Sequence, residues 1–482
     1  MMRYLTAFCL IWGCIGSQIA PAQTQERWSL RECLDYAEEQ NLDLKIAELN
    51  LESSEIDSQR TRMARVPNLN GNSSFNGNFG YVVNPFTNEF TAGGNQSFSL
   101  GLSSGVTLYN GGRLNQTMQQ ALVNQQVAKE DLAQAEYDLA LTLTLAYLDI
   151  LRNQELVKSA EIQVASTREQ RNRSARLVDA GVTPRVDLLQ IESQIATDEL
   201  ALVNARNQLE TAYLNLMQIM QLDPSQPFAI ESVEVDIPRN DFFDNPLSTY
   251  YQDGKNNMPF IRSADLQVQS AELGESIARS SYLPSLTAFA SMGTGWASGR
   301  RIPTGEMTTV FDTIGQSISL NNEQFQPGSL VIEGQQSVTS PYSFANQLRD
   351  NVNASVGLNL NIPIYNRYQN HAQVQQAEIR RVRAELVSAQ QRQRLEQDIQ
   401  AAYVQARSAY GTYTSTLRQI ESLELTFENT EKQFNLGVVH SVDFLIAKNN
   451  LARAHNDLVQ TMYNYIFRAK VLDFYQGKPL GF

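Results

Sequence analysis

Two stretches of the chain are too long and too regular for an ordinary globular domain. Residues 113–179 are rich in Ala, Leu and Gln, contain no proline, and carry an apolar stripe at helical spacing. At about 1.5 Å per residue, a helix over this range would be roughly 100 Å long. Residues 367–435 predict a second such helix. Because helices of this length need lateral neighbours, a coiled coil or a barrel of helices is expected.

Each long helix is followed by the signals of a tight helix-to-helix turn. Gly181 and Gly437 stand at the helix ends, where glycine takes the left-handed conformation readily. Thr183 and Pro184 predict an N-cap and a first helical position, so returning helices are expected over 184–221 and 441–475. The two turns match at a constant offset of 256, and the pairs are Gly181 with Gly437, Val182 with Val438, Val186 with Val442, Asp187 with Asp443 and Leu189 with Leu445.

The turns belong to an internal duplication. Residues 264–272 align without gaps on residues 47–55 at an offset of 217. Since the offset later rises to 256, the second half holds 39 extra residues, and they lie within the polar stretch 298–350. A proline-containing connector joins the halves. We expect a first repeat over 23–239 and a second over 240–482.

Four segments change from the helical period to alternation. In each, apolar side chains fall on one face and Asn, Ser, Thr or Gly on the other, as in a strand with one apolar face. The segments are residues 68–83, 97–109, 285–297 and 351–365. Their length suits tilted strands that cross a bilayer. The third is the weakest, because Phe289 breaks its alternation.

Two structures fit these strands. A soluble four-stranded sheet would bury its apolar face, but no amphipathic element is reserved to cover it. In the alternative, that face meets lipid. Four strands cannot close a barrel alone, and unpaired backbone groups at an open edge are not tolerated in lipid. The second structure therefore requires oligomerisation, and three chains would share twelve strands.

The first 22 residues have the composition of a secretory signal peptide. Arg3 supplies positive charge, an apolar segment follows, and Ala-Pro-Ala at 20–22 is a cleavage motif. Cys14 offers the alternative of cleavage before a lipidated cysteine. After removal of the signal peptide Cys33 would be the only cysteine, which excludes an internal disulfide and predicts a small buried side chain.

Composition disfavours nucleic-acid binding and catalysis. The chain has 51 acidic and 38 basic residues, a net charge of −13, and its basic residues are scattered. Its three histidines lack metal-ligand spacing. We find no nucleophile–base constellation, phosphate-binding loop or dinucleotide fingerprint. We therefore expect no enzyme, cofactor or bound metal, and no nucleic-acid partner.

Together these features resemble the TolC family of outer-membrane efflux and secretion channels. The resemblance rests on the duplicated helix–strand–strand–helix order, the paired Gly-Val…Val-Asp turns, and the strand exits Val-Thr-Leu-Tyr-Asn-Gly-Gly (106–112) and Asn-Ile-Pro-Ile-Tyr-Asn (361–366). It implies a mainly α-helical homotrimer in the outer membrane of a Gram-negative bacterium. Four strands per chain would form a shared twelve-stranded β-barrel in outer-membrane lipid, continued by a long α-helical barrel that extends into the periplasm.

The resemblance also implies partners and site residues. In the family, the helix-turn tips narrow the periplasmic end and contact a periplasmic adaptor protein, which links the channel to an inner-membrane transporter. The matching tip residues are Gly181, Val182, Gly437 and Val438. Asp187 and Asp443 match an acidic ring at the pore constriction, whereas a second acidic position holds Gln190 and Ile446. A carboxylate near a helix N-terminus is also favoured by the helix dipole alone, so a purely structural role stays open.

Two classes of function follow. The first is a passive outer-membrane exit duct of a tripartite efflux pump or type I secretion system. The second is a periplasmic coiled-coil adaptor or structural protein without a pore. The four alternating strands favour the duct, because an adaptor hairpin needs none. The absence of a Met- or His-rich tract disfavours a dedicated metal exporter among possible drug, metal or protein cargoes.

Overall fold

A computed structural model describes residues 27–478 except for gaps at 84–89, 233–236, 238–245, 315–318, 321–322 and 325–329. The expected signal peptide over 1–22 lies outside the described residues. The chain divides into two compact units, of which the first comprises Met1–Glu55, Val123–Val268 and Val382–Phe482, and the second Ile56–Leu122 and Gln269–Arg381. Each unit draws on both halves of the sequence, so the units are not the repeats 23–239 and 240–482.

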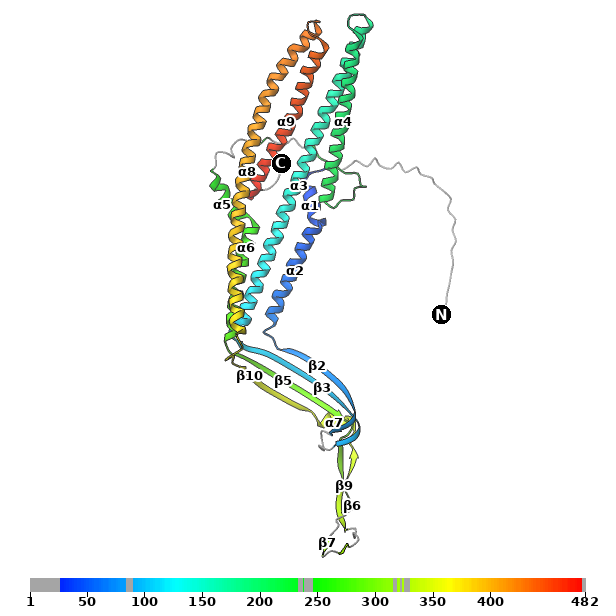
Figure 1. The fold of residues 1–482 in the computed structure, drawn as a ribbon, viewed down its shortest axis with the longest axis vertical. Coiled ribbons are helices and arrows are strands. Elements are labelled where there is room, and N and C mark those ends of the chain that lie inside the picture. The colour runs from blue at the N-terminus through cyan, green and yellow to red at the C-terminus, as the bar shows by residue number, and fades with distance from the viewer. Residues whose placement is uncertain are drawn as a thin grey trace, which may run out of the picture. The chain divides into compact units, whose positions relative to one another are not determined.

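Two helical hairpins form most of the first unit (Figure 1). They consist of α3 (Arg113–Asp179) with α4 (Arg185–Ile219), and α8 (Gln369–Asn435) with α9 (Ser441–Tyr475). Both α3 and α8 contain 67 residues and contribute to both units. The remaining longer helices are α2 (Leu42–Met63) and α6 (Pro259–Arg279). Among the described residues, no helix combines the length and apolarity needed to span a membrane.

Short elements from the start of the chain and from the connector complete the first unit. β1 (Arg27–Trp28) pairs in parallel with β4 (Ala229–Ile230). α1 (Leu30–Gln40) begins with a capping box, in which Glu32 N donates to Ser29 Oγ at 3.3 Å and Ser29 N donates to Glu32 Oε2 at 2.8 Å. α5 (Leu247–Asn257) follows the connector.

One apolar core fixes α1 and the two short strands to the long helices. Cys33 of α1, Tyr147 of α3, Leu216 of α4 and Ile466 of α9 are buried together. The Tyr147 hydroxyl donates to the carbonyl oxygen of Glu231 at 2.9 Å, directly after β4. A second core joins α5 to α8 and α9, and it contains Tyr250, Met258, Leu395, Ile399 and Leu472.

The second unit contains an antiparallel sheet in the order β10-β5-β3-β2 (Figure 1). Its strands are β2 (Asn68–Val83), β3 (Phe90–Asn110), β5 (Ser285–Ala297) and β10 (Asn353–Asn361). β2 and β10 are the outer strands, so each has one edge that pairs with no other described strand. The sheet is therefore open on both sides within one chain.

The register separates the two faces as the alternation predicts. Directly paired residues share a face, and one row across the sheet is Asn70, Ser103, Ser291 and Ser355. The next row, on the opposite face, is Gly71, Leu102, Met292 and Ala354. The apolar face carries large exposed side chains, among them Leu69, Phe79, Leu102, Val356 and Leu358.

Phe289 explains why the third strand alternates poorly. It lies on the polar face, paired with Gly105 on one side and Gly357 on the other. A Cβ atom at Gly357 would meet the Phe289 ring at 2.5 Å. The ring therefore occupies space that glycine leaves free, and the strand keeps its register.

Several predicted ends are wrong. The second strand, expected over 97–109, begins at Phe90, because Gly94 has no side chain and leaves room for the Phe79 ring. The fourth, expected over 351–365, ends at Asn361, since Pro363 offers no N–H and restricts the residue before it. The helix expected over 367–435 begins at Gln369, after Arg367 and Tyr368, which both have positive φ and are not helical.

The additional residues of the second half form more than the polar loop that their composition predicts. β6 (Arg301–Ile314) and β9 (Leu330–Pro341) form an antiparallel hairpin, beyond which lie the short β7 (Ser319–Leu320) and β8 (Glu323–Gln324). α7 (Phe344–Asp350) returns the chain to β5, where Gln347 is fully buried. Its amide donates to the carbonyl oxygen of Ala297 at 3.1 Å and accepts from the Ala297 N–H at 3.0 Å.

We expect Cys33 to be inert toward thiol reagents in the folded protein. Burial raises the pKa of its thiol to about 12, so almost no thiolate exists at pH 8. N-ethylmaleimide labelling, followed by mass spectrometry, should modify the mature protein only after denaturation. A Glu39→Cys variant, on the exposed side of α1, should label in the native state; rapid native labelling of Cys33 itself would contradict the buried core.

Candidate functional site at the helix-turn tips

The turn between α3 and α4 is a glycine-terminated helix end. Gly181 has φ +75°, the Val182 N–H donates to the carbonyl of Leu177 at 2.9 Å, and the Gly181 N–H donates to that of Val178 at 2.9 Å. The predicted cap at Thr183 is wrong. Pro184 occupies the N-cap position without a side-chain hydrogen bond, and helix α4 begins one residue later than expected, at Arg185.

The turn between α8 and α9 repeats this geometry. Gly437 also has φ +75°, and the Val438 N–H donates to the carbonyl of Gln433 at 2.9 Å. Open space surrounds the Cα of both glycines, so backbone conformation and not crowding requires glycine there. The two copies of the tip therefore share one backbone design.

Apolar side chains project from both tips. Val182 is 68% exposed and Val438 is 71% exposed. Val186 and Val442, one turn further on, are exposed as well. An exposed valine side chain is not stabilised by contact with water. Four such residues at matching positions provide an apolar contact surface at the end of the hairpins.

The two acids predicted at the constriction, Asp187 and Asp443, have different surroundings in the structure. The Ser441 hydroxyl donates to Asp187 Oδ1 at 2.9 Å and lies 3.1 Å from Gln190 Oε1. Asp187 therefore ties the first turn of α4 to the first turn of α9. Asp443 is exposed on α9. At an offset of 256, the residue that matches Ser441 is Arg185, so the same bond cannot form at Asp443 from an equivalent serine.

Behind the tips, a small core and a buried polar chain hold the hairpins together. Ile191 of α4 packs with Phe444 and Leu445 of α9. Further along, Lys448 Nζ donates to Thr167 Oγ1 at 2.8 Å, and Thr167 Oγ1 lies 2.6 Å from Asp198 Oδ2.

Lys448 and Asp198 are both buried, so a charged chain connects α9, α3 and α4. Burial lowers the pKa of the Lys448 ammonium, and the carboxylates of Asp198 and Glu431 partly offset this effect. This chain is not predicted from the sequence. Lys448 follows the apolar run Phe-Leu-Ile-Ala, which is the only local sign that it lies on a buried face.

The described residues contain no cluster of three or more His, Cys, Asp or Glu side chains that would hold a metal ion. The tips instead combine exposed apolar side chains, one exposed acid and a bonded acid. This is the chemistry of a contact surface.

Two long helical hairpins, together with an antiparallel sheet that has an exposed apolar face, point to the class of outer-membrane efflux channels. Residues 33–220 and 250–477 match the family described as outer membrane efflux protein. The chain belongs to this family. It is an efflux channel of the outer membrane of a Gram-negative bacterium and not an enzyme.

Known proteins agree with this assignment. The chain is 21% identical over 376 residues to the outer membrane efflux protein BepC of Brucella suis biovar 1 (strain 1330), covering 78% of this chain and 71% of BepC. Its fold is similar to the Campylobacter jejuni CmeC outer membrane channel, with a TM-score of 0.72 and 16% identity over 93% of this chain and 85% of CmeC. VceC of Vibrio cholerae gives a TM-score of 0.73 and 13% identity over 94% and 96%.

These similarities confirm the predicted TolC-like fold class, mainly helical with an internal duplication. They also favour the channel over the alternative of an adaptor without a pore.

Replacing Gly437 by alanine should loosen the second tip. Alanine at φ +75° costs roughly 1 kcal/mol, which would make hydrogen exchange of residues 433–445 about fivefold faster. Gly411 provides the matched control, because it lies inside α8 with open space around its Cα. Gly411→Ala should stabilise the helix by about 0.5–1 kcal/mol. Unchanged exchange at the Gly437→Ala tip would refute the argument from backbone conformation.

Proposed function

We propose that three copies of the chain form one passive exit duct. In this proposal the sheets combine into a twelve-stranded barrel in the outer membrane, and the long helices enclose a tunnel that extends into the periplasm. A periplasmic adaptor protein docks on the tips and connects the duct to an inner-membrane transporter of an efflux pump or type I secretion system. The observation that carries the proposal is the four-stranded sheet, which combines an exposed apolar face with two open edges.

The unpaired edges of the sheet support the proposal that several chains close into a ring. In lipid, each unpaired N–H or C=O group of β2 and β10 would cost several kcal/mol. Pairing β2 of one chain with β10 of the next satisfies both edges with a single type of contact. A head-to-tail contact of this kind forms a closed ring when the rotation between neighbouring chains divides a full turn evenly. Three copies would supply twelve strands, an even number within the range of outer-membrane barrels.

The exposed valines support the proposal that the tips dock to a partner protein. Val182 and Val438 would be covered by an adaptor, with Gly181 and Gly437 setting the turns on which they stand. Asp443 is the better candidate for an acid that lines the pore constriction, because it is exposed. Asp187 is half-buried and its carboxylate is held by the Ser441 hydroxyl, so it is the weaker candidate for the lining.

Planar-bilayer recording of purified protein tests the duct. An acidic lining favours cations, and we expect Asp443→Asn to lower the cation-to-anion permeability ratio more than Asp187→Asn does. Asp187→Asn instead weakens the bond between α4 and α9. Equal shifts would refute the assignment of roles, and absence of conductance in all three proteins would overturn the duct. A monomer in mild detergent would overturn the shared barrel.

Charge at the tips should abolish export without affecting assembly. In the double variant Val182→Asp, Val438→Asp, docking would bury six carboxylates per trimer, at a cost of up to several kcal/mol for each one that is fully buried. Export of a fluorescent dye from cells should fall at least about tenfold, with the amount of trimer in the outer membrane unchanged. Val203→Asp, an exposed position on α4 away from the tips, is the control. Normal export in the double variant would contradict docking through these valines.

A further inference from the structure

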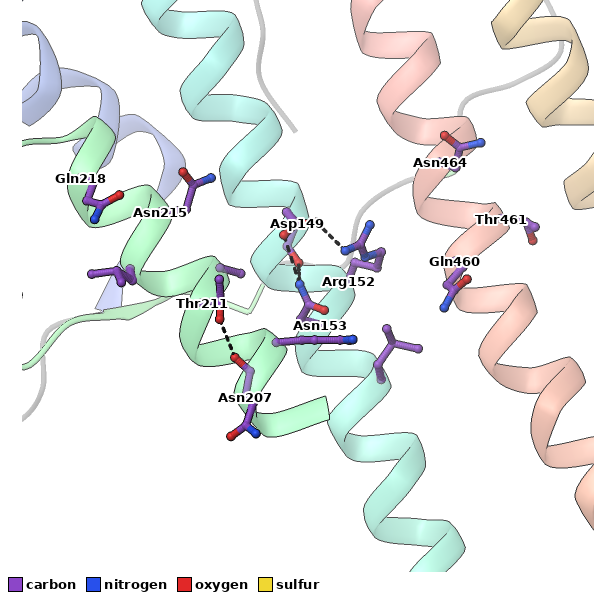
Figure 2. A pocket seen from close by; sticks show the side chains of 14 residues that line it. Asp149, Arg152, Asn153, Asn207, Thr211, Asn215, Gln218, Gln460, Thr461 and Asn464 are labelled. Carbon is purple, nitrogen blue, oxygen red and sulfur yellow. Dashed lines mark hydrogen bonds and ion pairs between the residues drawn. The ribbon is translucent and has the colours of Figure 1, made fainter. Parts of the chain in front are cut away.

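A polar concavity lies on α3, α4 and α9 within the first unit (Figure 2). Its volume is about 940 Å³. Half of its 14 lining residues are asparagine or glutamine, and two more are threonine. In Figure 2, Asn207 and Asn215 of α4 stand on one side of α3, and Gln460 and Asn464 of α9 on the other.

The amide side chains of this concavity are available to a ligand. Those of Asn207, Asn215, Gln218, Gln460 and Asn464 are exposed and make no side-chain hydrogen bond to another described residue. Each amide offers two donor hydrogens and one acceptor oxygen. The concavity therefore presents both kinds of hydrogen-bonding group over a continuous surface.

The concavity is electrically neutral although the whole chain carries a charge of −13. Its charged lining residues are Asp149 and Arg152, and Arg152 Nη2 lies 2.6 Å from Asp149 Oδ1. Asn153, almost fully buried, donates to the other carboxylate oxygen of Asp149 at 3.2 Å. The acid is thus held in place, and its charge is cancelled at the surface.

The concavity faces away from the elements that cover the long helices. Tyr147 and Leu151 of α3 point into the core with α1, β1 and β4. At 3.6 residues per turn, Asp149, Arg152 and Leu156 lie on roughly the opposite side of α3. On α4, Leu216 faces the core and the lining residues Asn207 and Asn215 do not, while Ala212 lies at the boundary between core and concavity.

In the proposed trimer this uncovered side is the lumen. Twelve helices at interaxial distances of about 8–10 Å enclose a tunnel roughly 25 Å wide. That width cannot hold three copies of α1, β1, β4 and their connectors. These elements must lie outside the ring, and the concavity must then lie inside.

We propose that the concavity is a luminal site for uncharged cargo that bears amide or hydroxyl groups. Its amides supply the hydrogen bonds, and Arg152 removes the repulsion or attraction that Asp149 would exert on ions. Its luminal placement rests on the proposed trimeric duct. Its binding chemistry rests only on the groups seen in one chain.

Three tripeptides with one backbone test the chemistry. They are triglycine with both ends blocked (uncharged), with a free carboxylate, and with a free amine, measured by ligand-observed NMR on detergent-solubilised protein. We expect saturable millimolar binding of the blocked peptide. Asn215→Leu with Asn464→Leu should weaken it about tenfold, as expected for two lost hydrogen bonds. Gln40→Leu, on the exposed side of α1, should not change it.

The charge pair gives a second, signed readout. Asp149→Asn leaves Arg152 uncancelled and should shift the preference toward the carboxylate peptide, by about two- to fivefold. Arg152→Gln should shift the preference toward the amine peptide by a similar factor. Absence of saturable binding, or binding that the leucine variants leave unchanged, overturns the site. Charge variants that shift nothing overturn the role of the pair.

Cysteine labelling tests the luminal placement of the concavity separately from its binding chemistry and from the proposed duct. A cysteine at Asn215 in the assembled protein should react with a small maleimide but not with one attached to a large polyethylene glycol, whereas Glu39→Cys should react with both. Binding without this size dependence would keep the ligand chemistry and overturn the luminal placement. If the protein forms no trimer or gives no conductance, the proposed duct is refuted, but the binding measurements still test the ligand chemistry of the concavity.

Discussion

Lateral support of two very long helices is the constraint on which the rest of the first unit depends. A single helix of 67 residues has no core of its own, and most helical stability in proteins comes from packing of its apolar side. The chain meets this need with separate clusters, around Tyr147 and Leu216, around Tyr250 and Ile399, and around Ile191 and Phe444. The first and third of these clusters combine residues from both sequence halves. Neither half can therefore complete its packing alone, although each repeats the other.

The sheet obeys a different constraint, the pairing of its backbone groups. Within one chain the inner strands β3 and β5 are paired on both sides, and β2 and β10 on one side only. One face of the sheet exposes leucine, valine and phenylalanine side chains, and their exposure to water is unfavourable. The helical and the sheet parts of the molecule thus have separate requirements, namely apolar packing for the helices and backbone pairing with cover for an apolar face for the sheet. Phe289 shows how little freedom remains, because its ring occupies the space that a side chain at the paired Gly357 would need.

Sequence alone predicted the features that depend on local chemistry. The helix ends at Gly181 and Gly437 follow from the left-handed conformation of glycine, and the faces of the strands follow from alternation. Features that depend on distant partners were missed. The hairpin of β6 and β9 contains no strict alternation, so its polar composition alone predicts a loop. Lys448 would normally be taken as a solvated charge, since its partner Thr167 lies 281 residues away in the sequence. The amide-lined concavity has the same origin, because its side chains come from three helices.

The tips show how far a duplication constrains a site. Both turns have the same φ at glycine and the same backbone hydrogen bonds, because these depend only on residues within each turn. The acids that follow depend on what faces them. Asp187 meets Ser441, whereas the repeat places Arg185 at the position that corresponds to this serine. A guanidinium and a hydroxyl differ in charge, length and hydrogen-bond capacity. One acid is therefore bonded across the two hairpins and the other is exposed, although the backbone of the two copies is the same.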